Sequence, residues 1–372
     1  MGTETKYQIF VTFSGETGKG GSTPIQEVQG IAVLSDGSAA PPTSVVGPFL
    51  EPRGMAMDAY GNLYVAQAEK SATAIFAYTN VGGFTSDGPP LVVAPTYPSP
   101  GTSYQSPALL HPYGLALNGS GTLFVSSQDT NVVSAYKLSF GSAKIPRSAA
   151  AAETSPALSA VYGGTFYPGQ YVMTSVPLKE NPKITTVPQI LGGLDYTKDT
   201  SAHSVRGIAI LNDTLYVVDE AAALVGTYAL PSGTFTGWIT TFGLNMPAMT
   251  APVGIATNDN KVYVGDSGSA TIYEWTPAGG STPGSLSVYL TDDTLKKVSG
   301  IAFLPDGSLV WGSREPVTAA DPPDPSADPA AHKSSNATFS IYRYVSNAAV
   351  QTWASGFSDT PECLLCVEVS SG

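Results

Sequence analysis

One phrase returns along this chain and restricts the folds open to it: a glycine in a short apolar strand, a tight turn, and a second apolar strand. Each of five copies continues into a third strand that ends in an aromatic residue, and a weaker fourth strand precedes the next glycine. Four antiparallel strands per repeat predict one blade of a β-propeller. The repeat glycines are Gly54, Gly114, Gly207, Gly254 and Gly300.

The two ends of the chain are expected to supply one further blade. Five complete blades account for about residues 52–357, and residues 361–367 resemble another innermost strand, with Cys363 where the glycine usually stands. Closure by both termini removes the free sheet edge. The sequence therefore predicts an all-β, six-bladed β-propeller of four-stranded antiparallel blades, a single domain over 1–372 closed by N- and C-terminal strands. The N-terminal segments with strand patterns are 7–13, 30–34 and 44–49.

Two stretches interrupt the regular spacing. Gly114 and Gly207 are 93 residues apart, against 46 or 47 between later repeat glycines, which predicts an insertion at about 139–183. A second insertion, at about 314–335, is rich in Pro and Asp and falls between the second and third strands of its blade. That connection is expected on the face where the inner strands begin, as either a lid over the channel or an ordinary solvated loop.

The sequence PRGMAMD at 52–58, followed by GNLYVA at 61–66, resembles the NHL repeat, and nearly the whole chain resembles NHL-type six-bladed propellers. The resemblance implies the fold more strongly than the function, because this superfamily includes senescence-marker-type lactonases, peptidyl-hydroxyglycine lyases, streptogramin lyases and interaction modules. Hydroxyglycine lyases of this kind hold zinc through histidines on inner strands. The lactonase pattern has Asn before the repeat glycine, where this chain has Arg53 and Arg206.

The amino-acid composition limits the kinds of partner that the protein is expected to bind. The net charge of −12 disfavours nucleic acid, because an acidic surface repels phosphate backbones. No apolar run approaches the ~20 residues of a membrane helix, so no membrane is expected as a partner. Low Lys content and abundant Ser, Thr and Gly suggest an extracellular or periplasmic protein whose signal peptide has been removed. We expect a monomer that acts on a small molecule.

Three residues of metal-binding type are expected near one another at the channel mouth. Glu51 and His111 stand three residues before their repeat glycines, and His203 lies one step further out in the next blade. Two imidazoles and a carboxylate can hold one divalent metal ion, Zn, Ca or Mg, or can divide acid and base roles. Alternatively, Glu-Pro and His-Pro before a strand are simply turn residues.

Other polar residues near the mouth are candidates for substrate binding. A guanidinium binds a carboxylate in two-pronged fashion, so Arg53 and Arg206 would suit an anionic substrate. The alternative for both is pairing with the acidic residues at the ends of second strands, which are Asp129, Asp219, Glu220, Asp266 and Glu315. Asp266 either lines the channel or accepts backbone N–H bonds in a turn. The full set of predicted binding residues is Arg53, Tyr113, Arg206, Asp266 and Lys297.

The two cysteines, Cys363 and Cys366, have the spacing of half a zinc knuckle, but the chain has no second pair. Two buried thiols and one disulfide both remain open.

Two functions are compatible with these residues. The first is an enzyme, a lyase or hydrolase acting on a small polar or anionic substrate at the central channel mouth, with Glu51, His111 and His203 as catalytic or metal-binding group. The second is a binding propeller without chemistry, lectin-like or scaffold. Lectins and scaffolds are expected to repeat their binding residues in every blade, whereas the mouth positions here differ from blade to blade. That asymmetry favours the enzyme.

Overall fold

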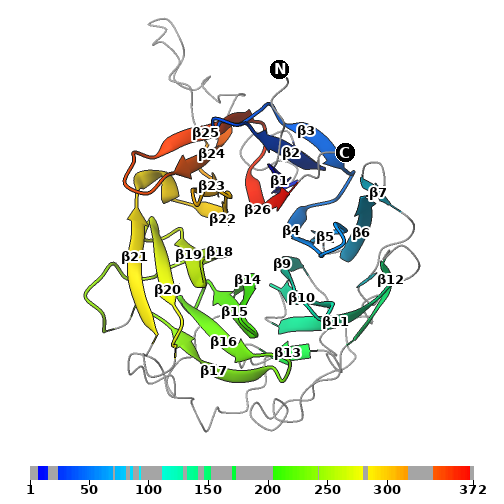
Figure 1. The fold of residues 1–372 in the computed structure, drawn as a ribbon, viewed down its shortest axis with the longest axis horizontal. Helices are drawn as coiled ribbons and strands as arrows, with labels where there is room; N and C mark the ends of the chain where they lie inside the picture. Colours follow the sequence, from blue (N-terminus) through cyan, green and yellow to red (C-terminus); the bar gives the residue numbers. More distant parts are fainter. Residues whose placement is uncertain are drawn as a thin grey trace, which may run out of the picture.

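Six antiparallel sheets surround a central axis in the computed structural model (Figure 1). The innermost strands of neighbouring sheets lie next to one another in the order β4, β9, β14, β18, β22, β26 and back to β4. The predicted all-β six-bladed propeller is therefore confirmed. The structure describes residues 7–15, 24–69, 72–80, 84–86, 92–93, 111–128, 132–140, 146–151, 170–172, 204–241, 243–279, 284–316 and 338–368.

Three blades follow the chain from the inner strand outward, each with four strands. A 3-10 helix, Asp293–Leu295, leads into the last of them. The strands are β14 (Val205–Leu211), β15 (Thr214–Asp219), β16 (Leu224–Ala229) and β17 (Thr234–Ile239), then β18 (Pro252–Asn258), β19 (Lys261–Asp266), β20 (Thr271–Thr276) and β21 (Ser285–Thr291), then β22 (Val298–Phe303), β23 (Leu309–Ser313), β24 (Phe339–Tyr344) and β25 (Gln351–Phe357).

Two further blades have a fifth strand, because their third strand pairs with two short segments in succession. The strands are β4 (Pro52–Met57), β5 (Leu63–Gln67), β6 (Ala74–Asn80), β7 (Phe84–Ser86) and β8 (Val92–Val93), then β9 (Pro112–Leu117), β10 (Thr122–Ser127), β11 (Val132–Phe140), β12 (Pro146–Ala151) and β13 (Gln170–Val172).

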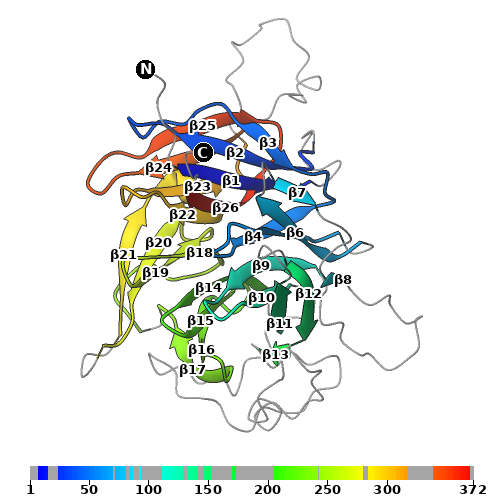
Figure 2. The same ribbon diagram turned by 45° about the vertical axis from the view of Figure 1, so that its right-hand side comes forward.

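The sixth blade is built from both ends of the chain. Its inner strand is β26 (Pro361–Glu368), which pairs with β1 (Tyr7–Phe13), and β2 (Val28–Val33) and β3 (Thr43–Val46) follow outward. Figure 2 shows β1 lying beside β26. This arrangement confirms the predicted closure, with one strand from the C-terminus and three from the N-terminus.

A buried carboxylate joins the two ends of the chain beside this blade. Asp359 is 0% exposed and accepts hydrogen bonds from Ser14 Oγ at 2.7 Å, Gly15 N at 2.8 Å and Ile25 N at 3.0 Å. Because a buried carboxylate needs such donors, these bonds fix the N-terminal segment against the segment that leads into β26.

Both predicted insertions fall partly outside the described residues. Within 139–183, β12 and β13 pair with β11, so part of the first insertion extends its blade. Most of 314–335 lies outside the described residues, and the lid expected there is untested. In the described part of the chain, no helix is long and apolar enough to span a membrane.

All six inner strands carry a β-bulge at the same place. On β4, Pro52 pairs with Gln67 of β5 and Met55 pairs with Val65, so β4 has one residue more than β5 between these two pairs. Corresponding register shifts occur on β9, β14, β18, β22 and β26. The extra residue is the one before the repeat glycine, or before Cys363 in β26. Since a bulge re-aims the side chain at its first position, this residue turns away from the regular pleat.

The repeat glycines allow the inner strands to approach backbone to backbone. A Cβ added at Gly54 would lie 2.5 Å from the carbonyl oxygen of Tyr113, and one at Gly207 would lie 2.7 Å from that of Val253. Real Cβ atoms do not approach this closely, so glycine is required at both positions. Neighbouring inner strands are thus closely packed at the centre of the ring.

Between neighbouring blades, a large side chain of one inner strand packs near a small side chain of the other. In each of four interfaces, a large apolar residue of one inner strand shares a buried cluster with the alanine of the preceding inner strand. This pairing explains the recurring Gly-x-Ala pattern, because two large residues would not fit between strands held this close. The pairs are Leu115 with Ala56, Ile208 with Ala116, Ile301 with Ala256, and Leu364 with Ala302.

Replacing Gly54 with Ala should destabilise the protein. The three nearest neighbours of the added Cβ are backbone atoms of β9, which can move only by displacing that strand. We expect the free energy of unfolding to fall by about 2 kcal/mol, the range for overpacking. Urea denaturation measures the change.

The matched control is Gly119→Ala, because a Cβ there meets nothing within 4 Å. Its free energy of unfolding should stay within about 0.5 kcal/mol of the wild-type value, as for most surface substitutions. Equal effects of the two substitutions would contradict the close-approach argument.

Candidate functional site at one end of the central channel

The residues before the repeat glycines bring polar side chains to the axis at one end of the ring. Five of these residues line the central channel, and four of the five are polar: Arg53, Tyr113, Ser299 and Glu362. Each occupies the first position of the bulge on its inner strand. Glu362 was not predicted, although the Pro361-Glu362-Cys363 segment corresponds to Pro52-Arg53-Gly54 in the first repeat.

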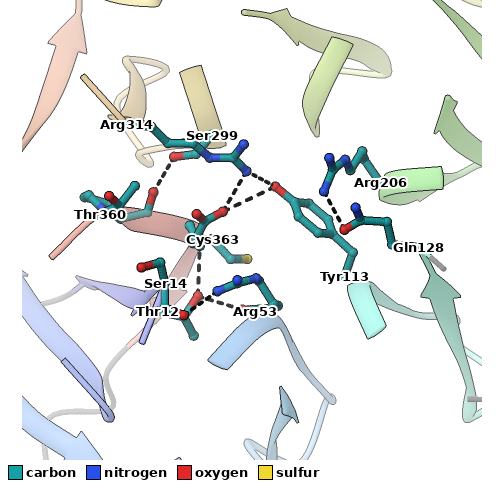
Figure 3. A network of polar contacts seen from close by, with 12 residues as sticks. Thr12, Ser14, Arg53, Tyr113, Gln128, Arg206, Ser299, Arg314, Thr360 and Cys363 are labelled. Atoms are coloured by element: carbon teal, nitrogen blue, oxygen red, sulfur yellow. Dashed lines mark hydrogen bonds and ion pairs between the residues drawn. The ribbon is translucent and has the colours of Figure 1, made fainter. Parts of the chain in front are cut away.

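Hydrogen bonds cross the channel at this end. Arg314 follows β23, and its Nη2 donates to Tyr113 Oη on β9 and, at 2.7 Å, to Glu362 Oε2 on β26 (Figure 3). Tyr113 Oη donates to the same Glu362 oxygen at 3.4 Å. The sheets that contain β9 and β23 lie on opposite sides of the ring, so the Arg314–Tyr113 bond bridges the channel.

Arg206 holds the other side of the tyrosine. Its guanidinium carbon lies 5.0 Å from the centroid of the Tyr113 ring, a cation–π contact. Its Nε donates to Glu220 Oε2 at 2.6 Å. Its Nη1 donates to Gln128 Oε1 (Figure 3). The Arg206–Glu220 pair is the acidic pairing that the sequence allowed as the alternative to substrate binding. We call Arg53, Tyr113, Arg206, Arg314 and Glu362 the axial network.

Arg53 connects the network to the N-terminal strand. Its Nη1 donates to the carbonyl of Ser14 at 2.7 Å, and its own carbonyl accepts from Thr12 Oγ1 at 2.6 Å. The same hydroxyl accepts from Cys363 N at 3.2 Å. Thr12 thus bridges β26 and β4. On β26, Cys363 stands where the other inner strands have the repeat glycine.

Burial sets the protonation states of the network. Desolvation raises the pKa of Tyr113 to about 12, so its hydroxyl keeps its proton at neutral pH. Burial also acts to raise the pKa of Glu362, but the charges of Arg314 and Arg53 outweigh it and hold this pKa below its usual value. For Arg314, desolvation acts to lower the pKa, but the attraction and hydrogen bond of Glu362 together with the other groups nearby raise it. Glu362 and Arg314 are therefore a charged pair.

Beyond the network, the inner strands line the channel with polar and apolar groups in similar measure. The channel volume is about 560 Å³, within the range of ligand pockets. At the network end, Arg53, Tyr113 and Glu362 are 5%, 8% and 7% exposed. Exposure increases toward the ends of the inner strands, where the lining residues are half-buried. These half-buried residues are Met57, Leu117, Ile210, Phe303 and Cys366.

Glu51, His111 and Lys297 occupy equivalent positions just before β4, β9 and β22. All three have left-handed backbone conformations, with φ of 52°, 49° and 58°. Each carbonyl accepts a backbone hydrogen bond, from Ala68 N, Gln128 N and Arg314 N respectively, so the turn role is present at all three.

The structure describes two of the three predicted metal ligands, Glu51 and His111. His203 lies outside the described residues. Among the residues that are described, no group of three or more His, Cys, Asp or Glu could hold a metal ion. The metal-binding prediction for Glu51, His111 and His203 therefore stays a prediction.

Asp266 lies at the end of β19 and is 0% exposed. Its carboxylate accepts from the backbone N–H groups of Thr250, Ala251, Gly268 and Ser269 at 2.6 to 3.0 Å. These bonds match the structural role that the sequence offered as an alternative to lining the channel.

The two cysteines are free thiols. Both belong to residues that line the channel. Burial raises the pKa of each to about 11, so neither is a thiolate at neutral pH.

A scan of protein-family models and a search of curated proteins found no match to this sequence. Solved structures that resemble it include a protein from Lactobacillus plantarum, with 12% identity, a TM-score of 0.54 and coverage of 98% of this chain and 100% of that one. Another is a "putative 6-phosphogluconolactonase" from Bacteroides uniformis, with 12% identity, a TM-score of 0.52 and coverage of 98% and 100%. A chain of a nidogen/laminin complex has 11% identity, a TM-score of 0.55 and coverage of 97% and 98%.

The chain has the six-bladed propeller fold. At identities of 11 and 12%, these similarities establish the fold alone. The resemblance to NHL-type six-bladed propellers is confirmed at that level. The same fold occurs in a protein described as a lactonase and in a complex of nidogen and laminin, so the function must be argued from the site.

Replacing Glu362 with Gln should destabilise the protein in a pH-dependent way. Loss of one partner from a buried pair leaves Arg314 uncompensated, so we expect a loss of about 3 kcal/mol at pH 7. Because the pKa of Glu362 is lowered in the folded state, its carboxylate stabilises the fold above the unfolded value of about 4.3, and this contribution disappears as the pH falls through the folded pKa. The difference between wild type and variant should therefore narrow below about pH 4.

Urea denaturation at neutral and acidic pH measures this difference. The control is Glu274→Gln, because Glu274 also accepts from a tyrosine, Tyr263, and pairs at 2.8 Å with Lys261, whose side chain is 36% exposed. That pair is more solvated, so its loss should cost only about 1 kcal/mol. A Glu362→Gln effect that is constant down to pH 3 would contradict the assignment of a charged pair.

Proposed function

We propose that the protein is an enzyme of the lyase or hydrolase class that acts on a small anionic substrate at the axial network. The observation that carries this proposal is the meeting of three guanidinium groups, one carboxylate and one protonated phenol at the end of an open channel. This combination offers charge complementarity and a proton donor in one place.

Tyr113 is the proposed proton donor. Both reaction classes release a leaving group whose oxygen takes up a proton, and the raised pKa of Tyr113 keeps that proton available. The phenolate that remains would lie between Arg206, at its ring, and Arg314, at its oxygen. Those two cations would stabilise it, because charges are only weakly screened in a buried site.

Arg314 and Arg53 are the proposed groups that attract the substrate anion. Arg53 lines the channel. Arg314 lies directly behind Tyr113 and Glu362, to which its Nη2 donates. Arg206 is held by Glu220 and Gln128, which makes it a positioning residue for Tyr113.

A divalent metal ion remains a proposed part of this site. Glu51 and His111 precede neighbouring inner strands, and the sequence places His203 before the next one. Carboxylate and imidazole ligands suit Zn, and the carboxylate also suits Ca or Mg. A metal held there would act as a Lewis acid beside the network.

The alternative is a propeller that binds a ligand or a protein without chemistry. One observation favours it: Arg206, Arg314, Tyr113 and Glu362 are bonded to one another or to neighbouring residues, so the network also stabilises the ring.

A small-molecule partner, a monomeric state and an extracellular or periplasmic location are also proposals. Nucleic acid and membranes are not proposed as partners, because the chain carries a net charge of −12 and lacks apolar runs of membrane-helix length.

Replacing Tyr113 with Phe should reduce turnover. We expect activity on substrates that carry one free carboxylate and release an alcohol, in assays of monoalkyl esters of dicarboxylic acids, lactones that bear a carboxylate, and 3-alkoxy acids that can eliminate. Loss of the proton donor should lower kcat by about 10²-fold with little change in KM, the typical contribution of general acid catalysis. Steady-state kinetics separates the two constants.

Tyr263→Phe is the matched control, because Tyr263 is also buried and also donates to a glutamate, Glu274, but in another blade. It should leave kcat unchanged. If no substrate of the panel is turned over, or if the two variants behave alike, the binding propeller becomes the better interpretation.

Metal analysis of the purified protein tests the second part of the proposal. We expect about one equivalent of a divalent ion in the wild type and its loss in His111→Ala, because imidazole ligands contribute directly to metal affinity. Lys297→Ala, at the equivalent position before β22, should retain the ion. Metal content that is absent from the wild type, or unchanged in His111→Ala, would rule out this metal site.

A further inference from the structure

Two side chains of opposite charge line the channel at the network end. Among the described residues that line it, Arg53 and Glu362 are the ones with charged side chains. They occupy the same bulge position on neighbouring inner strands, β4 and β26, and are 5% and 7% exposed. Burial acts to raise the pKa of Glu362, but the charges of Arg314 and Arg53 lower it, so Arg53 is close enough to act on this carboxylate. A ligand at this end of the channel therefore meets a cation and an anion together.

One oxygen of the Glu362 carboxylate has no partner. Tyr113 Oη and Arg314 Nη2 both donate to Oε2, whereas Oε1 accepts no hydrogen bond from the part of the chain that the structure describes. Buried carboxylate oxygens are ordinarily bonded, because an unsatisfied buried acceptor costs free energy. A ligand that brings an N–H or O–H group to Oε1 would supply the missing donor.

The other two guanidinium groups of the axial network already have carboxylate partners. Arg206 pairs with Glu220 and Arg314 pairs with Glu362, and neither arginine lines the channel. Arg53 donates instead to a backbone carbonyl, that of Ser14, and its side chain lines the channel. Arg53 is therefore the cation that an anionic group in the channel would reach.

A ligand that carries an anion alone fits this pair poorly. An anion at Arg53 would also lie near the negative charge of Glu362, and the two would repel one another where solvent screens charge only weakly. A cationic donor at Glu362 Oε1 would offset this repulsion and add a charge-assisted hydrogen bond. The pair therefore suits a ligand with one negative and one positive group.

We propose that the channel binds an amino acid in its zwitterionic form, with the carboxylate at Arg53 and the ammonium group at Glu362 Oε1. This inference rests on the proposed substrate site and narrows its substrate class to a carboxylate that also carries an amino group, or to an ester or ether derived from one. Its test measures binding and does not require turnover.

Calorimetric titration at pH 7 with unbranched ω-amino acids, from glycine to 5-aminopentanoate, tests the proposal. Each is compared with the carboxylate that lacks the amino group and the amine that lacks the carboxylate, as 4-aminobutanoate is with butanoate and propylamine. Because Arg53 and Glu362 have fixed positions, affinity should pass through a maximum as the amino acid lengthens. At that length the amino acid should bind at least about tenfold more tightly than either analogue.

Two outcomes of this titration would overturn the proposal. One is an amino acid series that binds no better than the matched carboxylates or amines at any length. The other is no binding of any amino acid at millimolar concentration.

Glu362→Gln tests the ammonium contact in protein shown by its thermal melt to be folded. Affinity for the preferred amino acid should fall by about tenfold, while affinity for the matched carboxylate stays the same or rises, because a repulsive charge is gone. Glu274→Gln is the control, since Glu274 also accepts from a tyrosine and pairs with a cation, but in another blade. It should bind both ligands as the wild type does. Equal loss of both ligands in Glu362→Gln would refute the contact.

A modified ligand gives the same test without a variant. The N-acetyl derivative of the preferred amino acid keeps the carboxylate but lacks the ammonium charge, so it should bind the wild type about tenfold more weakly. Equal affinity for the two would refute recognition of the ammonium group.

Arg53→Gln tests the other end of the ligand. Affinity for the preferred amino acid should fall by about tenfold, while that for the matched amine stays the same or rises. Equal loss of both ligands would refute the carboxylate contact.

This inference and the enzyme proposal can fail separately. Selective binding of an amino acid, without turnover of any of its esters or ethers, would support the inference and contradict the enzyme proposal. Turnover of simple carboxylate substrates, with no preference for those that carry an amino group, would do the reverse.

Discussion

The structure depends on the close approach of six inner strands around one axis. At Gly54 and Gly207 this approach leaves no room for a Cβ, because the carbonyl of the next inner strand occupies that space. The glycine follows a bulge on every inner strand except β26, where Cys363 takes its place. The bulge and the glycine after it therefore have two effects. They let the inner strands close the ring, and they turn the preceding side chain toward the axis, where the site lies.

The fold does not itself require charge at the axis. Val253 and Ser299 occupy the same bulge position as Arg53, Tyr113, Arg206 and Glu362, and both are buried there. A buried ion pair rarely stabilises a protein more than apolar residues of similar volume, since desolvation offsets the attraction. The stability of the fold therefore does not by itself explain why Glu362 and Arg314 are charged.

The fold was predictable because its signals are local and repeated. The Gly54 phrase recurs at nearly constant spacing, and the partial phrases at the two ends add up to one blade. The site was predictable only in part. Tyr113 and Arg206 share a position that the repeat defines, whereas Arg314 lies at the end of a second strand and reaches across the ring to Tyr113. No local pattern encodes a contact between residues separated by 201 positions.

Chain closure and the axial network are physically coupled. Glu362 lies on β26 and Arg53 on β4, the two inner strands that meet where the ends of the chain join. Thr12 of β1 bonds to both strands, and Arg53 donates to Ser14 just beyond it. Because β1 and β26 come from opposite termini, these residues gain their positions only when both termini have paired. The charged end of the channel therefore requires the pairing of the two termini, and a propeller left open at this junction would lack it.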